Sequence, residues 1–333
     1  MSIRDVAARA GVSPATVSRV FTRPESVAAD TRRRVMAAAE ELQYVPHAAA
    51  RSLAQGRTGN LGVVVPDIAN SWSATITKAV QQEARRDGFA LFVAGSDEAA
   101  VDEELWARAM VPRVDGLLLV SPQMPDTALQ SIADLIPVVV TNRVLDDIPA
   151  VLTNTFEATG HAVEHLHSLG HRRLVYLAGP QGYANEVRLD GFRSACARLG
   201  IEAAELGPFH ARFTEGVRAA DLVLATEATG VVAYNDEIAV GVLNRLADRG
   251  VRVPEHVSVV GFDDTGLAEM VTPRLTTVRI PAASAGVAAV SLLLSVMAGR
   301  DVSGRSLVEL PGELIIRAST GGVPGSVATR GSQ

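Results

Sequence analysis

The sequence of 333 residues is 47% hydrophobic and 20% charged, which is typical of a soluble globular protein and leaves room for two or three domains. Its single cysteine, Cys196, excludes an internal disulfide framework, and its longest apolar runs are too short to span a membrane. The net charge of −6 is unevenly distributed. Residues 1–58 hold nine Arg and five acidic residues and carry +4, so the remainder of the chain carries −10. The basic N-terminal end is therefore expected to bind a polyanion.

The first elements are predicted to be a helix, a turn and a second helix. Ile3–Ala10 has its apolar residues on one helical face, and Gly11 supplies the permissive backbone of a tight turn. Ser13 is a good N-cap, and Pro14 suits the first position of the next helix. A third helix is expected from about residue 30 to 42. This layout is typical of a helix-turn-helix, whose second helix enters the major groove of DNA.

The second helix has an inward and an outward face. Val17 and Val20 face the first helix, which leaves Arg19 pointing outward. A guanidinium can donate two hydrogen bonds to one guanine, so Arg19 is the strongest candidate for reading a base. The alternative is a generic three-helix bundle with a solvated arginine. The DNA-contacting residues expected in the headpiece are Ser13, Pro14, Ala15, Thr16, Ser18 and Arg19.

The N-terminal segment resembles the headpiece of the lactose-repressor (LacI/GalR) family. The resemblance begins with residues 3–20, which read IRDVAARAGVSPATVSRV. It continues through residues 31–35, 38–42, 44, 46 and 50–53. It implies a helix-turn-helix domain over residues 1–45 that binds double-stranded operator DNA as a homodimer, since one headpiece reads only half of a palindrome. Ala28 departs from the pattern, because many members carry a capping serine there.

Residues 46–59 are expected to form a hinge between headpiece and body. A helix over about residues 48–54 would have two turns and would not be stable alone in water, so a flexible linker is one interpretation. The family resemblance implies instead a hinge helix that orders on DNA and inserts Leu53 into the minor groove, where an apolar wedge kinks the duplex. Ala50, Arg51 and Leu53 are therefore candidate DNA contacts.

From Leu61 onward, strand-like apolar runs alternate with helix-length stretches, which predicts an α/β body of parallel sheets covered by helices. Strands are expected at residues 61–65, 89–94, 116–120, 138–141, 174–178, 230–234 and 257–261. Helices are expected at residues 72–87, 155–169, 190–199, 237–249 and 283–297. So many units indicate two doubly wound lobes, with a ligand cleft at the carboxyl ends of the strands.

Residues 60–320 also resemble the periplasmic-binding-protein-like domain of the same family. The resemblance rests on segments such as Val65–Ile68, Leu169–Arg172 and Val259–Asp264. It implies a ligand-binding and dimerisation domain whose chain crosses between lobes three times. The N-lobe is expected at about residues 60–152 and 281–308, the C-lobe at about 153–280 and 309–320, and a disordered tail at 321–333.

Polar side chains near the ends of the expected strands, together with one tryptophan, are candidate effector contacts. They are Trp72, Ser121, Asn142, Arg188, Asn235 and Asp263. A sugar or nucleoside needs carboxylate, amide and guanidinium groups for its hydroxyls and an aromatic ring for its apolar face. The resemblance assigns effector contacts to Arg188, Asn235 and Asp263.

Other roles remain open for several of these residues. Asn235 and Asp236 could cap the following helix, and Arg188 and Asp263 could form an ion pair between the lobes. Asp264 is interpreted as a cap or turn residue rather than a ligand contact.

The sequence contains no Walker loop, HExxH or GxSxG motif, so the protein is expected to be neither an enzyme nor dependent on a cofactor. His161 and His165 are one helical turn apart, but a solvated helix face is a better explanation than a metal site because further ligands are lacking. The N-terminal residues lack the apolar segment of a secretion signal, which favours a cytoplasmic location without membrane contact.

Together these features predict a sequence-specific transcription regulator, most simply a repressor, controlled by a small-molecule effector in the interlobe cleft. A solute-binding sugar receptor without DNA function shares the body fold, but it would need a secretion signal and would not need residues 1–58. A sugar-modifying enzyme on the same scaffold is a third alternative, which an assay of turnover would separate from binding.

Overall fold

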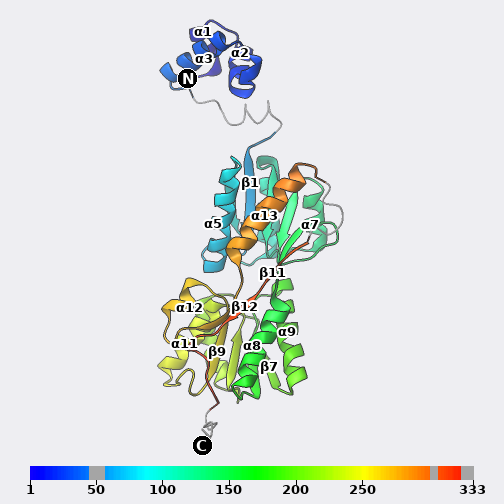
Figure 1. Cartoon of the computed structure of the whole chain (residues 1–333), viewed down its shortest axis with the longest axis vertical. Helices are drawn as coiled ribbons and strands as arrows, with labels where there is room; N and C mark the ends of the chain where they lie inside the picture. The colour runs from blue at the N-terminus through cyan, green and yellow to red at the C-terminus, as the bar shows by residue number, and fades with distance from the viewer. Residues whose placement is uncertain (45–56, 301–306, 324–333) are drawn as a thin grey trace, which may run out of the picture. The chain divides into compact units, whose positions relative to one another are not determined.

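The computed structural model describes residues 1–44, 57–300 and 307–323. The contacts within it divide the chain into an N-terminal unit and a large body (Figure 1). The described part of the N-terminal unit begins with a headpiece of three helices and one short 3-10 turn. They are α1 (Ile3–Ala10), α2 (Pro14–Thr22), η1 (Pro24–Ser26) and α3 (Ala29–Glu41). The three predicted helices are confirmed.

The headpiece has its own small hydrophobic core. Val6, Val17 and Val35 are fully buried and come from α1, α2 and α3 in turn. The α1 helix ends at Gly11, whose φ of 63° is in the left-handed region that glycine adopts without strain. At the start of α3, Ala28 makes no side-chain capping bond, so this helix lacks the cap that a serine would provide.

The first sheet of the body has six strands in the order β11-β5-β4-β3-β1-β2, and every pairing described within it is parallel. Its strands are β1 (Asn60–Val65), β2 (Ala90–Gly95), β3 (Gly116–Val120), β4 (Val138–Thr141), β5 (Ala150–Asn154) and β11 (Leu307–Pro311). The strand order reverses direction around β1 and β3, as in doubly wound sheets.

The second sheet has the order β12-β10-β9-β8-β6-β7, with β12 antiparallel to β10 and the other pairs parallel. Its strands are β6 (Arg173–Leu177), β7 (Glu202–Leu206), β8 (Gly230–Ala233), β9 (Ser258–Asp263), β10 (Thr276–Arg279) and β12 (Glu313–Ile315). The predicted fold of two lobes built on parallel sheets is confirmed.

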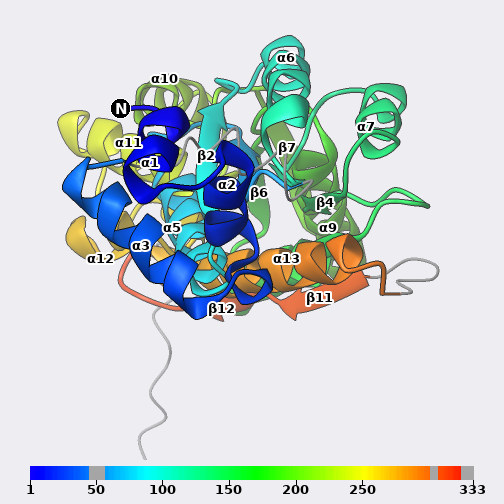
Figure 2. The ribbon, with the colours of Figure 1, turned by 90° about the horizontal axis from the view of Figure 1, so that it is seen from above.

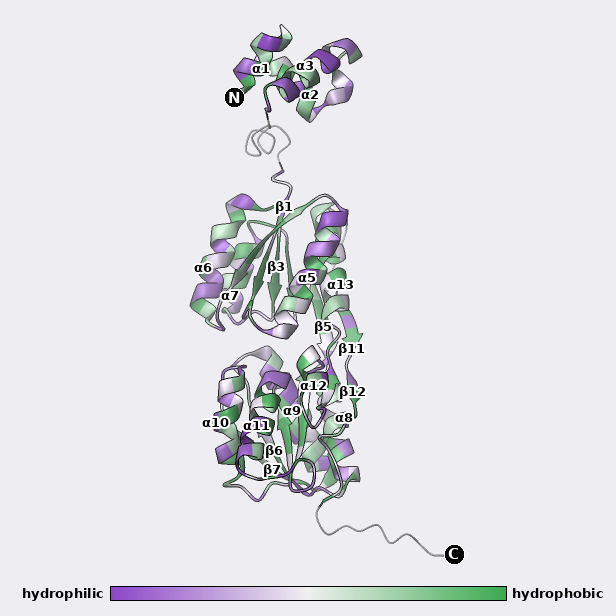
Figure 3. Cartoon of the chain, turned by 90° about the vertical axis from the view of Figure 1, so that its left-hand side faces the viewer, coloured by the Kyte–Doolittle hydropathy of each residue, from purple (hydrophilic) through white to green (hydrophobic). Residues whose placement is uncertain are grey.

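Helices cover both faces of each sheet. In the N-lobe, α5 and α13 lie on one face of the sheet and α6 and α7 on the other (Figures 2 and 3). In the C-lobe, α8 packs against α9 and α10 packs against α11. The helices of the N-lobe are α5 (Ser71–Arg86), α6 (Ala100–Met110), the 3-10 turn η2 (Val111–Arg113), α7 (Asp126–Ala133) and α13 (Ala282–Met297). Those of the C-lobe are α8 (Thr155–Ser168), α9 (Tyr183–Leu199), α10 (Phe213–Val223), α11 (Asp236–Asp248) and α12 (Gly266–Met270).

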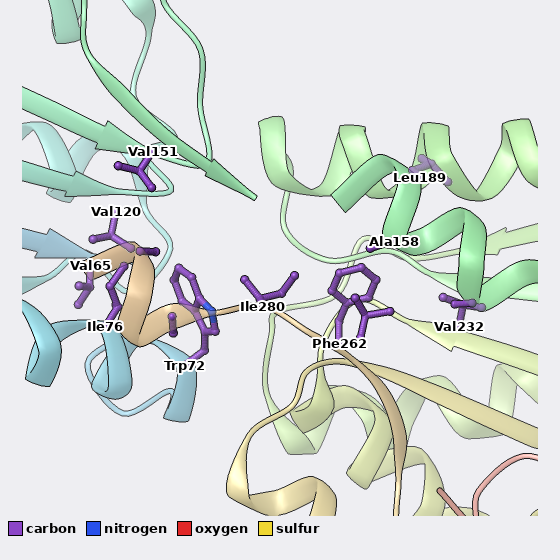
Figure 4. Packing of buried hydrophobic residues seen from close by; sticks show 14 of the residues in the cluster. Val65, Trp72, Ile76, Val120, Val151, Ala158, Leu189, Val232, Phe262 and Ile280 are labelled. Carbon is purple, nitrogen blue, oxygen red and sulfur yellow. The ribbon is translucent and has the colours of Figure 1, made fainter. Parts of the chain in front are cut away.

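The strands supply the centre of the core, as the green strands between helices show in Figure 3. Burying a large aliphatic side chain stabilises the folded state by about 1.5–3 kcal/mol. Figure 4 shows Trp72, Ile280 and Phe262 between the apolar side chains of the two lobes, in one continuous cluster. Cys196 is buried in this cluster, as expected for a small core residue, and burial raises the pKa of its thiol to about 12.

The chain crosses between the lobes three times. The crossings follow β5 at Asn154, β10 at Ile280 and β11 at Gly312. The last crossing comes a few residues after the expected boundary at 308–309, because β11 pairs with β5 as far as Pro311. Gly312 permits the turn, since a Cβ there would meet the Cβ of Ala158 at 2.7 Å.

The prediction of a disordered tail over residues 321–333 is wrong for residues 321–323, which are ordered on the C-lobe. The N–H of Gly321 donates to the Ser258 hydroxyl at 3.0 Å, and the Gly321 carbonyl lies 3.1 Å from Nε2 of the buried His171. These bonds anchor Gly321 on the C-lobe, and the N–H of Val323 donates to the Leu169 carbonyl at 3.2 Å. The rest of that segment lies outside the described residues.

Candidate nucleic-acid interface and ligand cleft

The start of α2 is capped as the sequence predicted. The backbone N–H of Thr16 donates to Ser13 Oγ at 3.1 Å, and the two hydroxyl oxygens lie 2.9 Å apart. Pro14 occupies the first helical position, where its missing N–H costs nothing. This cap fixes the end of the helix that is expected to approach DNA.

One face of α2 is exposed and the other is buried. Val17 and Val20 are buried, whereas Pro14, Ala15 and Arg19 are exposed. Thr16 and Ser18 are half-buried. The guanidinium of Arg19 makes no hydrogen bond or ion pair with any residue that the structure describes, so it is available to a partner outside the chain.

The other predicted DNA contacts are Ala50, Arg51 and Leu53. They lie outside the described residues, as does the hinge helix expected over about residues 48–54. Their roles therefore stay predictions.

The body brings all six predicted effector residues to one cavity of about 50 Å³, called here the central cavity. Its lining consists of Pro66, Asp67, Asn70, Trp72, Ser73, Glu98, Ser121, Asn142, Ala184, Arg188, Ala211, Tyr234, Asn235 and Asp263. Both lobes contribute, and Ser121, Asn142 and Asp263 lie at the carboxyl ends of strands, as in other open α/β sheets. A volume of this size holds a few water molecules.

Arg188 and Asp263 form the charged centre of this cavity. The guanidinium lies over the rings of Tyr234 and Phe262, at 4.6 and 4.3 Å from their centres, and donates to the Tyr234 carbonyl at 2.6 Å. Arg188 and Asp263 are 3.7 Å apart. Burial raises the pKa of the Asp263 carboxyl well above its ordinary value, although the nearby Arg188 lowers it. The idea of an ion pair between lobes is wrong, because α9 and β9 belong to the same lobe.

Asn235 and Asp236 act within the C-lobe. Asn235 Oδ1 accepts from the N–H of Ile238 at 2.9 Å, which confirms the capping alternative. Asp236 is fully buried and accepts from the N–H of Thr265 at 2.7 Å. Burial raises the pKa of Asp236 to about 6. Asn235 still borders the central cavity, so capping and ligand contact are compatible for it.

The side chains of Ser121 and Asn142, which follow β3 and β4, are hydrogen-bonded to each other. Asn142 Nδ2 donates to Ser121 Oγ at 3.0 Å, and both residues have a positive φ, 52° and 49°. Asp264 also has a positive φ, 54°, and its carboxylate pairs with Arg279 and Arg317 at 2.8 and 2.6 Å. These contacts agree with a turn residue at Asp264 and leave it outside the lining of the central cavity.

Trp72 contributes the aromatic wall of the central cavity. Only 8% of the residue is exposed, and its indole N–H has no hydrogen-bond partner among the described residues. The Arg188 Nε–H is likewise buried and unpaired there. Two buried donors without acceptors are costly, so both are available to an acceptor group that enters the cavity.

Three polar residues of the N-lobe were missed in the sequence. Asp67, Asn70 and Glu98 border the central cavity and reach across it to the C-lobe. Asn70 Nδ2 donates to Glu237 at 2.9 Å, Asp67 lies 3.5 Å from Arg212, and Glu98 lies 3.0 Å from the His210 ring. Asp67 and Glu98 follow β1 and β2, so the rule that selected Ser121 would have found them had it been applied to every strand.

No cluster of three metal-binding side chains occurs in the described ranges 1–44, 57–300 and 307–323. His161 is exposed, but the ring of His165 is half-buried and lies 2.9 Å from the Thr320 hydroxyl, so the expected solvated face is only partly correct. None of the helices described is long and apolar enough to cross a bilayer.

Comparison with known proteins agrees with both parts of the chain. A family model for bacterial regulatory proteins of the lacI family matches residues 2–47, and one for a periplasmic binding protein-like domain matches residues 163–320. The transcriptional repressor CytR of Escherichia coli K12 is 32% identical over 335 residues, with 97% of each chain covered.

Solved structures also match. The lac repressor dimer bound to operator and the anti-inducer ONPF has a TM-score of 0.84 and 28% identity, covering 96% of this chain and 99% of that one. A LacI family regulator from Enterococcus faecium with bound ribose has a TM-score of 0.71 and 27% identity, covering 79% of this chain and 98% of that one.

Proposed function

Because the chain belongs to the lacI family of bacterial regulatory proteins, we propose that it is a cytoplasmic transcriptional repressor that binds a palindromic operator as a dimer. The observation that carries the proposal is the unpaired Arg19 on the exposed face of α2. The opposite face of α2 is buried, so the helix can enter the major groove only with Arg19 outward. The 32% identical relative is a repressor, which favours repression over activation.

A dimer is supported by the edge of the N-lobe sheet. The strand β2 is an edge strand, and its consecutive residues Phe92 and Val93 are both about 45% exposed. On the neighbouring α6, Val101, Leu105 and Trp106 are exposed as well. An uncovered apolar edge invites association, and a second copy would cover it with two-fold symmetry.

The effector is proposed to be a sugar or a related metabolite such as a nucleoside, bound in the central cavity. The related regulator from Enterococcus faecium holds ribose. The carboxylate of Asp263, the amide of Asn142 and the guanidinium of Arg188 offer acceptors and donors to hydroxyl groups. Trp72 offers an apolar face to the ring.

Lobe closure would link this cavity to DNA. Residues 46–59 are proposed to form the hinge and residues 60–320 the effector domain. The side chains of Asp67, Asn70 and Glu98 contact the C-lobe, so a ligand that changes the lobe spacing also moves the N-lobe that carries the hinge. A differential affinity of a few kcal/mol for two lobe arrangements is enough to favour or oppose hinge ordering on DNA.

The alternative of a sugar receptor without DNA function leaves the headpiece unexplained. A direct test measures binding of the full-length protein to DNA fragments from its own genomic neighbourhood, with and without ribose and ribonucleosides. Binding to a palindrome that a small molecule alters supports the proposal. Small-molecule binding with no sequence-specific DNA binding would favour the receptor instead.

A further inference from the structure

Glu103 on α6 carries a buried carboxyl group that lies outside the lining of the central cavity. Only 5% of the residue is exposed. Its Oε2 accepts from the backbone N–H of Gln123 at 2.8 Å, whereas its Oε1 has no hydrogen-bond partner among the described residues. An ionised carboxylate would leave a buried charged oxygen unpaired, which is costly. A proton on Oε1 removes the charge and leaves Oε2 free to accept from Gln123.

Gln123 belongs to the β3–α7 loop (residues 121–125), which joins the sheet to a helix lying beside α6 on one face of the N-lobe (Figure 3). Arg143, which follows β4, donates to the carbonyls of Pro122 and Met124 at 3.0 and 2.6 Å. Both Pro122 and Met124 are buried. The backbone of the loop is therefore held from two sides, by the N–H bonded to α6 and by two carbonyls bonded to the guanidinium.

The same loop faces the C-lobe. Ser121 borders the central cavity, and Gln123 borders a small pocket together with residues 180–185 of the C-lobe. A Cβ at Gly182 would lie 3.6 Å from Gln123 Cγ, which is ordinary van der Waals contact with the residue that precedes α9. The position of the β3–α7 loop therefore determines one of the contacts between the lobes.

The surroundings of Glu103 favour its neutral form. Burial raises the pKa of the carboxyl group from 4.5 to about 7, although the backbone of Gln123 and Met124 and the charge of Arg143 lower it. The strands β2 and β3, which pack against α6, contain no charged residue. The other charged residues of α6 and α7 are exposed or half-buried: Asp102, Glu104, Arg108, Asp126 and Asp134.

We propose that Glu103 is a proton-controlled clamp of the β3–α7 loop, whose neutral form holds the loop against α6 and the C-lobe and whose ionised form releases it. When the loop leaves α6, water reaches the carboxyl group and favours the ionised form. Loop docking is therefore strongest below pH 4.5 and weakens as pH rises through about 7. The inference does not depend on the proposed function, because it concerns the body without DNA or ligand.

The test measures backbone hydrogen exchange of the full-length protein by mass spectrometry at pH 5 and pH 8, without ligand or DNA. Chemical exchange itself accelerates with pH, so each rate is compared with that of Glu103→Gln at the same pH. The glutamine keeps an acceptor for the Gln123 N–H and cannot ionise. Exchange times are chosen so that the buried strand β8 stays protected in both proteins, and the measurement then reports local opening rather than global unfolding.

The natural protein should exchange residues 121–125 within about fivefold of the Glu103→Gln rate at pH 5, and at least about tenfold faster than Glu103→Gln at pH 8. Glu104→Gln, whose side chain pairs with Arg108 on the outer face of α6, should behave like the natural protein at both pH values. Glu103→Ala lacks the acceptor and should exchange the loop rapidly at both pH values. If Glu103→Ala does not fold, the comparison with Glu103→Gln decides alone.

Equal exchange of the loop in the natural protein and in Glu103→Gln at pH 8 would overturn the inference. A loop that exchanges no earlier than β8 in the natural protein at pH 8 would also overturn it, because the loop would then open only when the whole lobe unfolds.

Discussion

The guanidinium of Arg188 lies 3.7 Å from the carboxylate of Asp263, and less than a tenth of either side chain is exposed. At this distance the two groups attract one another without a direct hydrogen bond. Because both belong to the C-lobe, the pair exists before the lobes close on a ligand. Its unused donors and acceptors are therefore in a fixed arrangement for the hydroxyl groups of the proposed effector.

Replacing Asp263 by Asn should weaken both ligand binding and stability. The substitution keeps the shape but leaves the buried Arg188 guanidinium without its charged partner, so the melting temperature should fall. Loss of the charged acceptor should weaken effector binding by about 1.5–3 kcal/mol. Calorimetry and thermal unfolding check the two effects. Unchanged affinity would show that Asp263 does not contact the ligand.

Arg19→Ala should weaken specific DNA binding by about 1–3 kcal/mol and relax the preference at one guanine. The exposed side chain has no partner among the described residues, so the headpiece itself should remain folded. Anisotropy titrations with the operator and with random DNA measure the difference. The control Arg34→Ala removes the same charge from the exposed face of α3. It should weaken binding to the operator and to random DNA by the same factor. An equal loss on both DNAs for Arg19→Ala would contradict base reading.

Glu103→Gln should alter how stability depends on pH. Glu103 on α6 is 5% exposed, accepts from the Gln123 N–H at 2.8 Å, and has a pKa raised from 4.5 to about 7 by burial. The folded state therefore holds a proton that the unfolded state has lost between these pH values, and stability falls as pH rises through 7. The pKa difference corresponds to about 3 kcal/mol.

The glutamine variant stays neutral and keeps an acceptor for Gln123. Its melting temperature should equal that of the natural protein at pH 4.5 and should be higher than that of the natural protein at pH 8. Glu104→Gln, at the next position and paired with Arg108, is the matched control and should leave the pH dependence unchanged. If the melting temperatures of all three proteins changed with pH by the same amount over this range, the role of Glu103 would be refuted.

Val93→Lys should disrupt the proposed dimer. Val93 lies on the exposed edge strand β2, and a lysine there places a charge where a second copy would pack. Light scattering should show a monomer, and operator affinity should fall at least tenfold because the two half-sites are then bound independently. Leu222→Lys adds the same charge to an exposed position of α10 and should leave the dimer intact.

The sequence predicted the elements that contain continuous apolar runs or clear caps. The strands β3 and β4 and the helix α1 have the expected bounds, because burial on both sheet faces or one helix face left a strong pattern. The strand β7 was not predicted: its residues Glu202–Leu206 are largely exposed, and backbone pairing with β6 holds it. Such edge strands carry little hydrophobic signal.

The site residues that could be predicted from the sequence are those whose positions follow from one sheet alone. Ser121 and Asn142 follow neighbouring strands and were found from that position alone. Glu98 also follows a strand, but its contacts with His210 and the N–H of Ala211 cross between lobes. A contact that depends on the closure of two lobes leaves no local pattern in the sequence.

Selection of bound DNA from a random pool by the full-length protein tests the central claim most directly, namely that a pair of α2 helices reads a palindrome through Arg19. The account predicts enrichment of one inverted repeat with a guanine at matching positions of both halves, and loss of that guanine preference in Arg19→Ala. A pool that shows no palindrome at low salt, with and without ribose and ribonucleosides, would contradict it.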